Sequence, residues 1–328
     1  MKIGTDQYNT FDTMTMDCWN DRVYYEGKEF PAGQFAAEIL NFAGVIHDPL
    51  LERITVLTAL VDDLSTAEKS KRHDIAAQLK PLLHDTVSWL YTCPPFCYCE
   101  SQGAYEDLEH ALSEERLDRD YEEGEAHLPY LALSSCEPIL RILVAIYNFC
   151  LLIRTFEMKY LRGLKRRNAD AFAKAAHECF DEDDSFLILL EQMPFGGVEE
   201  FFSYPRVITG FNYFQDENNE EKWKTAQRVI CKRAIDFYVF DLMNGLHHGH
   251  APSQCQGCGR YFLTTNGHTP KYCDGVAPQD NRYTCRQYGA MKHQKEQNKQ
   301  HPVYRLFNTR TDTIRKHHWR GKISDDLR

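Results

Sequence analysis

The sequence lacks the short motifs by which the common nucleotide-binding and hydrolytic enzymes are recognised. It contains no Walker loop, no G-x-S-x-G elbow and no G-x-G-x-x-G fingerprint. The segment HECFD, which begins at His177, has Asp181 where a metalloprotease HExxH motif needs its second histidine. We therefore predict no enzyme activity. An enzyme built from scattered residues would instead require a concave pocket lined by converging polar groups.

Long apolar runs are missing as well. Residues 1–20 are polar and contain no apolar segment of the kind that forms a secretory signal. The most apolar stretch, residues 139–153, is shorter than the roughly 20 residues of a membrane-spanning helix, and Arg141 and Asn148 interrupt it. The sequence therefore predicts a cytoplasmic protein without a membrane partner, in which this stretch is a buried helix.

Acidic residues are scarce in the last quarter of the chain. The 328 residues carry a net charge of −10, yet residues 251–328 hold 14 basic and six acidic residues. Residues 1–250 therefore have a net charge of −18. This asymmetry indicates an acidic body joined to a basic module, which can meet an anionic partner or be attracted to the body itself.

Periodicity predicts a mainly α-helical fold with a short β-hairpin near the N-terminus. Residues 22–30 contain β-forming side chains around Glu26–Gly27, which is typical of a hairpin. Beyond Phe35, apolar residues three and four positions apart predict helices. These helices are expected over residues 35–46, 73–91, 134–164, 168–180 and 220–246.

A change of composition predicts where the helical body ends. The segment HHGHAPSQ, residues 247–254, is polar and contains glycine and proline. We therefore expect a helical body over residues 1–250 and a second module over residues 251–328.

The cysteines give the strongest functional signal. Twelve cysteines in a reducing compartment are expected to be buried thiols or metal ligands rather than a disulfide framework. Four of them are close together near the C-terminus: Cys255, Cys258, Cys273 and Cys285. The first two form a C-x2-C pair whose turn contains Gly257, and Gly259 follows it. Four thiolates can close a tetrahedral site without an open position, which is typical of structural zinc. His268 is the alternative to one of the thiolates.

The residues between the cysteines predict how such a site would fold. Residues 260–265 and 268–273 have β-like composition on either side of Asn266–Gly267, which predicts a hairpin. Thr284 is a suitable N-cap for a helix that begins at the last cysteine. Knuckle, hairpin and helix together predict a treble-clef-like zinc finger whose folding energy comes from the bound metal.

Residues 250–323 resemble the C-terminal finger of an uncharacterised bacterial family, a domain of unknown function in which a long helical region precedes the finger. The resemblance is carried by the segments CQGCGRYF, HTPKYCDGVAP and TCRQYGA. The same segments are more distantly similar to the CGNR-type zinc finger of bacterial transcription regulators, although Arg286–Gln287–Tyr288 stand where that finger has Gly-Asn-Arg. The resemblance implies that the four cysteines are zinc ligands.

Basic residues near the finger predict a nucleic-acid interface. On a helix that begins at the last cysteine, one face would carry Tyr288, Lys292, Lys295 and Lys299. Further candidate contacts follow in the tail: Arg305, Arg310, Arg315, Lys316, Arg320 and Lys322, with Trp319 beside them. Val303, Phe307 and Ile314 are placed to dock this tail. Such a basic surface with interspersed aromatics is typical of DNA or RNA binding.

Two interpretations of the finger follow. In the first, the protein is a transcription-regulator-like protein that binds DNA or RNA through the finger and the basic tail. In the second, it is an interaction scaffold in which zinc is purely structural and the acidic body recruits a protein partner.

Two further groups of residues are weaker candidates. Cys93, Cys97 and Cys99 are close in sequence, but no fourth metal ligand lies at a suitable spacing. A histidine cluster at residues 247–250 lies in the polar hinge, where solvent exposure is the simpler interpretation.

Overall fold

The protein is described from a computed structural model that covers residues 13–42, 47–100, 102–118, 121–123, 126–128, 130–191, 206–216, 219–267 and 270–324. The chain divides into two compact units. The large unit comprises residues 1–253 and 261–269, and the small unit comprises residues 254–260 and 270–328. Most of the described elements are helices, as the sequence predicts.

The large unit contains a five-stranded antiparallel sheet with the strand order β3-β2-β1-β7-β6. Its strands are β1 (Met14–Trp19), β2 (Arg22–Tyr25), β3 (Lys28–Pro31), β6 (Val207–Asp216) and β7 (Asn219–Cys231). Strands β2 and β3 form the expected hairpin, because Glu26 and Gly27 both have left-handed backbone angles, with φ of 46° and 72°. Two such residues make the turn that matches the twist of a hairpin. The predicted N-terminal hairpin is confirmed.

The expected helix over residues 220–246 is wrong in its first half. Residues 219–231 form the long strand β7, and helix α10 (Ala234–His247) begins only after it. The strand pairs with β6 on one side and with β1 on the other, where Asp17 lies opposite Arg228. The two oxygens of the Asp17 carboxylate accept hydrogen bonds of 2.9 Å from the Arg228 guanidinium. Asp17 and Arg228 lie 211 positions apart in sequence, so local periodicity cannot reveal this pairing.

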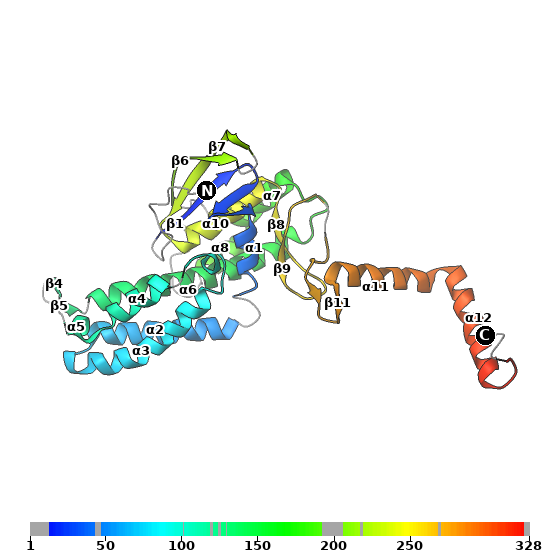
Figure 1. Ribbon diagram of the computed structural model, residues 1–328, viewed down its shortest axis with the longest axis horizontal. Coiled ribbons are helices and arrows are strands. Elements are labelled where there is room, and N and C mark those ends of the chain that lie inside the picture. The colour runs from blue at the N-terminus through cyan, green and yellow to red at the C-terminus, as the bar shows by residue number, and fades with distance from the viewer. Residues whose placement is uncertain are drawn as a thin grey trace. The chain divides into compact units, whose positions relative to one another are not determined.

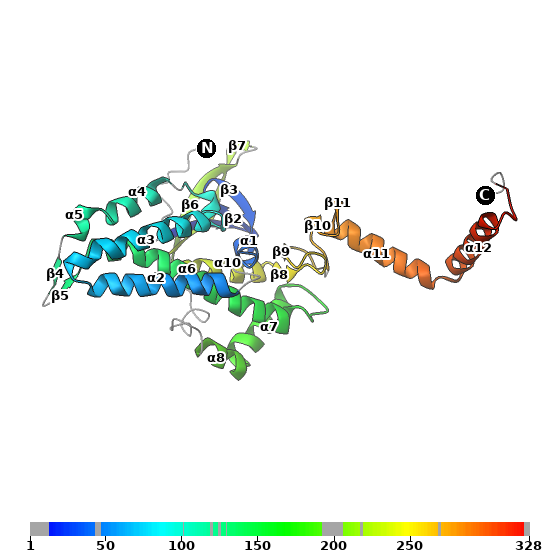
Figure 2. The ribbon, with the colours of Figure 1, turned by 90° about the horizontal axis from the view of Figure 1, so that it is seen from below.

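Helices form most of the rest of the large unit. They are α1 (Gln34–Ile39), α2 (His47–Thr66), α3 (Lys69–Leu90), α4 (Gln102–Ala111), α5 (Glu114–Leu117), α6 (Tyr130–Phe156), α7 (Ala169–His177), α8 (Asp184–Glu191) and α10, with the short turns η1 (Phe96–Tyr98), η2 (Glu157–Leu161) and η3 (Glu178–Glu182) and the small strands β4 (Tyr121–Glu123) and β5 (Ala126–Leu128). Helix α2 packs against both α3 and α6 (Figures 1 and 2). The core contains buried residues from these helices and from the sheet.

Helix α6 is the longest helix of the large unit among the described residues. Ile139, Leu143, Ile146 and Phe149 on this helix are all buried, so the predicted buried helix is confirmed. Within the described part of the chain, the segment 132–161 is also the one stretch long and apolar enough to cross a membrane, and 61% of its apolar window is buried inside the protein. The cytoplasmic location stays a prediction.

Helix α10 joins the sheet to the rest of the core. The Phe237 ring lies 5.6 Å from the Tyr25 ring and 5.5 Å from the Phe35 ring. One turn later the fully buried Asp241 carboxylate accepts hydrogen bonds from the backbone N–H groups of Gly33 and Ala36, each 2.9 Å long. Burial raises the pKa of Asp241 to about 7, although these backbone donors favour the charged form. Asp241 therefore fixes the start of α1 from inside the core.

Over the described residues 260–265 and 270–273, the predicted hairpin does not form. Strand β9 (Tyr261–Thr264) pairs instead with β8 (Ala251–Gln254), which precedes the cysteine pair. The Asn41 side chain holds β9 in place by accepting from the Tyr261 N–H at 2.7 Å and donating to its carbonyl at 2.9 Å. This contact spans 220 positions and has no signature in the local sequence.

The small unit consists of a cysteine cluster followed by two helices. Its elements after the first cysteine pair are β10 (Val276–Ala277), β11 (Asp280–Thr284), α11 (Cys285–Gln300) and α12 (Pro302–Trp319). Strands β10 and β11 form a short antiparallel hairpin between the third and fourth cysteines. Pro302 is at the first turn of α12, where a missing N–H group costs nothing because it would have no helical partner.

Candidate metal centre

The first two cysteines lie in a tight turn that aims both sulfurs to one side. The Cys255 N–H donates to the Arg260 carbonyl at 2.8 Å, and the Gly259 N–H donates to the Cys255 carbonyl at 2.9 Å. Gly259 has a φ of 74°, a left-handed conformation that favours glycine. A Cβ atom at Gly257 would lie 3.3 Å from the Cys285 sulfur. Both glycines therefore allow the knuckle to close around the cluster.

The last two cysteines are placed by the β10–β11 hairpin and the start of α11. The Cys285 N–H donates to the Gly275 carbonyl at 2.7 Å, and the Arg286 N–H donates to the Cys273 carbonyl at 3.1 Å. Thr284 caps α11 as the sequence predicts. Its hydroxyl accepts from the Gln287 N–H, and the Gln287 side chain accepts from the Thr284 N–H. This capping box fixes the helix start, and with it the backbone of the fourth cysteine.

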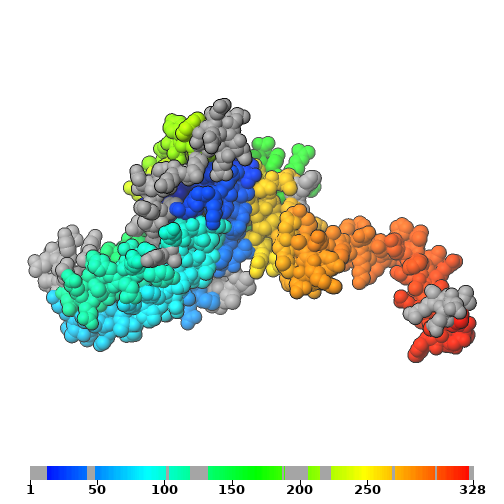
Figure 3. Space-filling view, in the orientation of Figure 1, coloured from blue at the N-terminus to red at the C-terminus, as the bar shows by residue number. Residues whose placement is uncertain are grey.

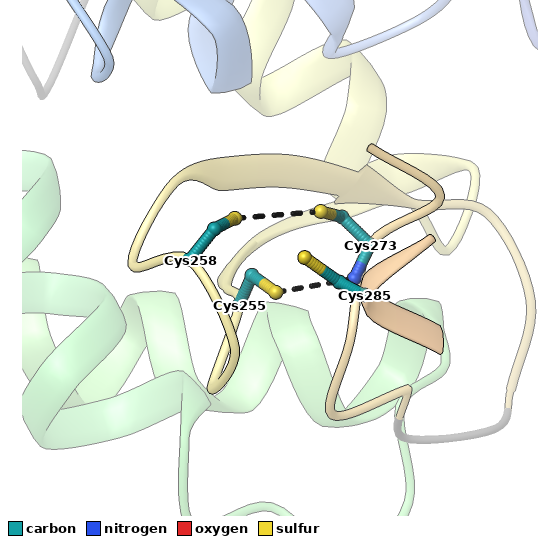
Figure 4. A group of neighbouring side chains, drawn as sticks. All are labelled: Cys255, Cys258, Cys273 and Cys285. Atoms are coloured by element: carbon teal, nitrogen blue, oxygen red, sulfur yellow. Dashed lines mark hydrogen bonds between the residues drawn. The ribbon is translucent and has the colours of Figure 1, made fainter. Parts of the chain in front are cut away.

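The four sulfur atoms converge on one point (Figure 4). All four lie within 4.8 Å of one another, and the Cys258 and Cys273 sulfurs are 3.6 Å apart. Sulfurs bound tetrahedrally at about 2.3 Å from a zinc ion would be separated by about 3.8 Å, so the spacing fits a metal. It is too long for a disulfide, whose sulfurs lie about 2.05 Å apart, and all four cysteines are free.

The surroundings of the cluster favour a negative charge on one sulfur. Burial opposes ionisation of the Cys255 thiol, but the backbone N–H groups of Cys273, Cys258 and Gly257 lower its pKa to about 7. Two of these donors, on Gly257 and Cys273, lie 3.3 Å from the sulfur. Burial raises the pKa of Cys273 to about 11 and also raises that of Cys285. A bound cation would offset the cost of ionising these buried thiols.

Packing around the cluster includes two residues that the sequence analysis missed. A Cβ atom at Gly289, in the interior of α11, would lie 2.4 Å from the Tyr272 ring, so only glycine leaves room for this ring. The Gln279 side chain donates to the Gly257 carbonyl at 3.1 Å and supports the knuckle. Because a glycine in a helix interior is unfavourable by itself, Gly289 could have been recognised in the sequence as a position of close packing.

The predicted basic contacts lie on the two C-terminal helices. Tyr288 on α11 is half-buried, whereas the basic side chains are exposed: Lys292, Lys295 and Lys299 on α11, Arg310, Arg315 and Lys316 on α12, and Arg320 directly after it. Among the described residues of α12 none is buried, and the expected docking residues Val303, Phe307 and Ile314 are 66%, 63% and 42% exposed. Figure 3 shows both helices, orange to red, with their side chains at the surface.

The weaker candidates do not form a second metal site. Over the ranges that the structure describes, the four-cysteine cluster is the one group of converging metal-binding side chains. Cys93 is buried, Cys97 is exposed, and Cys99 lies 3.2 Å from the Tyr25 hydroxyl. His250 is buried and hydrogen-bonded to the Ala32 carbonyl at 2.9 Å. His268, the alternative ligand, lies outside the described residues.

Fold and site together define a mainly helical protein whose C-terminal part carries a four-cysteine centre able to hold a metal ion. A family model with the description "Family of unknown function (DUF6076)" matches residues 203–328, which include β6, β7, α10 and the whole cysteine cluster. The expected similarity of the C-terminal part to an uncharacterised family is confirmed over these residues. No curated protein and no solved structure matches the chain.

Proposed function

We propose that the four cysteines hold one Zn²⁺ ion and that this ion folds the small unit into a treble-clef-like finger. The convergence of four sulfurs at metal-compatible spacing supports this assignment. Knuckle, β10–β11 hairpin and the start of α11 supply the parts of such a finger. Four thiolates leave no coordination position for a substrate, so the ion has a structural role.

Metal analysis of the purified chain tests the identity of the ion. We expect one zinc per chain and no visible absorption. A tetrahedral set of four cysteines also suits iron, so iron and sulfide in place of zinc would overturn the assignment.

We further propose that α11 and α12 bind nucleic acid through the phosphate backbone. The observation that carries this function is the charge of the two exposed helices, which hold eight Lys and Arg residues and two acidic residues. Lysine and arginine that contact phosphates release counterions, and this supplies most of the affinity of non-specific binding. A distant similarity to the CGNR-type finger of transcription regulators, expected from the sequence, would agree with this function.

Charge reversal on α11 tests the nucleic-acid proposal. The triple variant Lys292→Glu, Lys295→Glu, Lys299→Glu is expected to lose DNA and RNA binding in a titration at low salt, because each reversal removes a phosphate contact and adds repulsion. A matched control with the same change of net charge is Lys71→Glu, Lys165→Glu, Lys232→Glu, three exposed positions of the large unit. Equal binding by the two variants would reject the proposal.

A protein partner is the second candidate, and the apolar residues of α12 favour it. Val303, Phe307 and Ile314 lie on one side of this helix and are exposed, a pattern by which amphipathic helices enter grooves of other proteins. In this case zinc is purely structural, as in the scaffold interpretation. This function predicts that the chain has no affinity for nucleic acid at low salt. It also predicts a defined protein partner that no longer binds the Phe307→Asp variant.

A further inference from the structure

A groove lies in the angle between the two C-terminal helices of the small unit. The chain turns at His301 and Pro302, so one side of α11 faces the first two turns of α12. The groove has a volume of about 400 Å³ and is open to solvent. Its lining residues are Met291, Gln294, Lys295, Asn298, Lys299, Tyr304 and Asn308.

The apolar part of the groove can receive a flat ring. Tyr304 on α12 is 46% exposed, and Met291 on α11 is 41% exposed. The His301 ring contacts the Tyr304 ring at a centroid distance of 6.0 Å and nearly at right angles. The exposed part of the Tyr304 ring can stack on a nucleobase, because every nucleobase has a face that stacks on an aromatic side chain.

The polar part of the groove matches the remaining parts of a nucleotide. Gln294, Asn298 and Asn308 carry primary amides, each of which offers both donors and an acceptor, as the Watson–Crick edges of bases require. Lys295 and Lys299 are exposed one helical turn apart on α11 and can contact successive phosphates. Among the described residues that line the groove, none is acidic.

We propose that the groove between α11 and α12 binds an unpaired nucleotide of a single-stranded nucleic acid. Tyr304 stacks on the base, the amides contact its edge, and the two lysines contact the flanking phosphates. Bases in a duplex are stacked on one another and paired, so their faces and Watson–Crick edges are not accessible to such a groove. This inference rests on the proposed nucleic-acid function and adds to it a preference for single strands.

The test compares three labelled probes of one sequence: a DNA single strand and an RNA single strand of roughly 12 nucleotides, and the corresponding DNA duplex. Fluorescence anisotropy with the full zinc-loaded chain should show tighter binding of at least one single strand than of the duplex. Tyr304→Leu should weaken binding of that strand about tenfold, because it removes one stacking contact. Tyr304→Phe keeps the ring and should retain the affinity.

Tyr213→Leu is the matched control, because Tyr213 is an exposed tyrosine of strand β6 and does not line the groove. Zinc content and circular dichroism establish that each variant is folded. Equal binding of single strands and duplex, or equal affinities of Tyr304→Leu and Tyr213→Leu, would overturn the groove assignment. In that case, the charge-reversal variant of Lys292, Lys295 and Lys299 would still test the proposed nucleic-acid function by itself. No binding of any probe by the unaltered chain would overturn both.

Discussion

The large unit and the small unit differ in what fills their interiors. Aromatic and aliphatic side chains from the sheet and helices such as α6 and α10 fill the large unit. In the described residues of the small unit, the buried side chains are those of Cys255, Cys273, Cys285 and Ala277. Three of these four are candidate metal ligands. An apolar core thus fills one part of the chain, whereas converging cysteine sulfurs take its place in the other.

The same difference appears in the helices that leave each interior. Helix α10 buries a full face, including Phe237 and Asp241, whereas α12 has no buried residue among those described. A helix is marginal in water without tertiary packing, so α11 depends on its anchored start at Cys285. The comparison leads to four predictions, in order of decreasing effect.

Removal of the metal should affect the small unit alone. Structural zinc sites contribute roughly 10–16 kcal/mol of folding free energy, so a strong chelator or Cys285→Ser should abolish hydrogen-exchange protection in β10, β11 and α11. The control Cys97→Ser changes an exposed thiol outside the cluster and should leave protection unchanged. Protection of α11 that survives chelation would show that the small unit folds without the ion.

Truncation of a buried aromatic ring should destabilise the large unit and leave the small unit unchanged. Phe237→Ala removes a fully buried ring that contacts Tyr25, Phe35 and Tyr238. It should lower the free energy of unfolding of the large unit by about 3–5 kcal/mol, measured by denaturant titration. The zinc content should stay the same. An equal loss of zinc would mean that the two units are not stabilised independently.

The buried carboxylate should make the large unit sensitive to pH. The pKa of Asp241 is raised from 3.8 to about 7 in the folded chain. Between these values the folded state holds a proton that the unfolded state has released, so this group lowers the free energy of unfolding as pH rises from about 4 to 7. The change cannot exceed about 1.4 kcal/mol per pH unit.

Asp241→Asn cannot titrate, and its amide nitrogen would face a backbone N–H donor. We expect a loss of about 1–3 kcal/mol that is larger at pH 5 than at pH 8, measured by urea unfolding at both values. A loss that is independent of pH would contradict the raised pKa.

Loss of the helix cap should have the smallest effect. Thr284→Ala removes the hydroxyl that accepts from the Gln287 N–H and should cost about 1 kcal/mol, or roughly a fivefold weaker zinc affinity in a competition titration. Thr313→Ala, on the exposed side of α12, serves as the control. Indistinguishable affinities would show that the capping box does not position Cys285.

Features set by neighbouring residues could be predicted from the sequence. The hairpin turn at Glu26–Gly27, the start of α11 at Thr284 and the convergence of the four cysteines all depend on short spacings. Features set by distant partners could not. Strand β7 pairs with β1, where Arg228 and Asp17 lie 211 positions apart, and β9 is held by Asn41 rather than by the residues that follow it.

The groove between α11 and α12 escaped prediction for a related reason. Tyr304 and Asn308 belong to a different helix from Met291 and Lys295, and the groove depends on the bend between them. Helical periodicity shows which residues share a side of one helix, but not what a second helix brings opposite them.

The path of the main chain limits how this protein can be divided for experiments. The chain crosses from one unit to the other at residues 253–254, 260–261 and 269–270. A C-terminal fragment that begins at Cys255 would contain β9 but not Asn41, which holds this strand in place. A fragment that begins at residue 270 would lack Cys255 and Cys258, two of the four cysteines of the cluster. Shortened versions for biochemistry should therefore retain both units, or replace residues 261–269 with a designed connector.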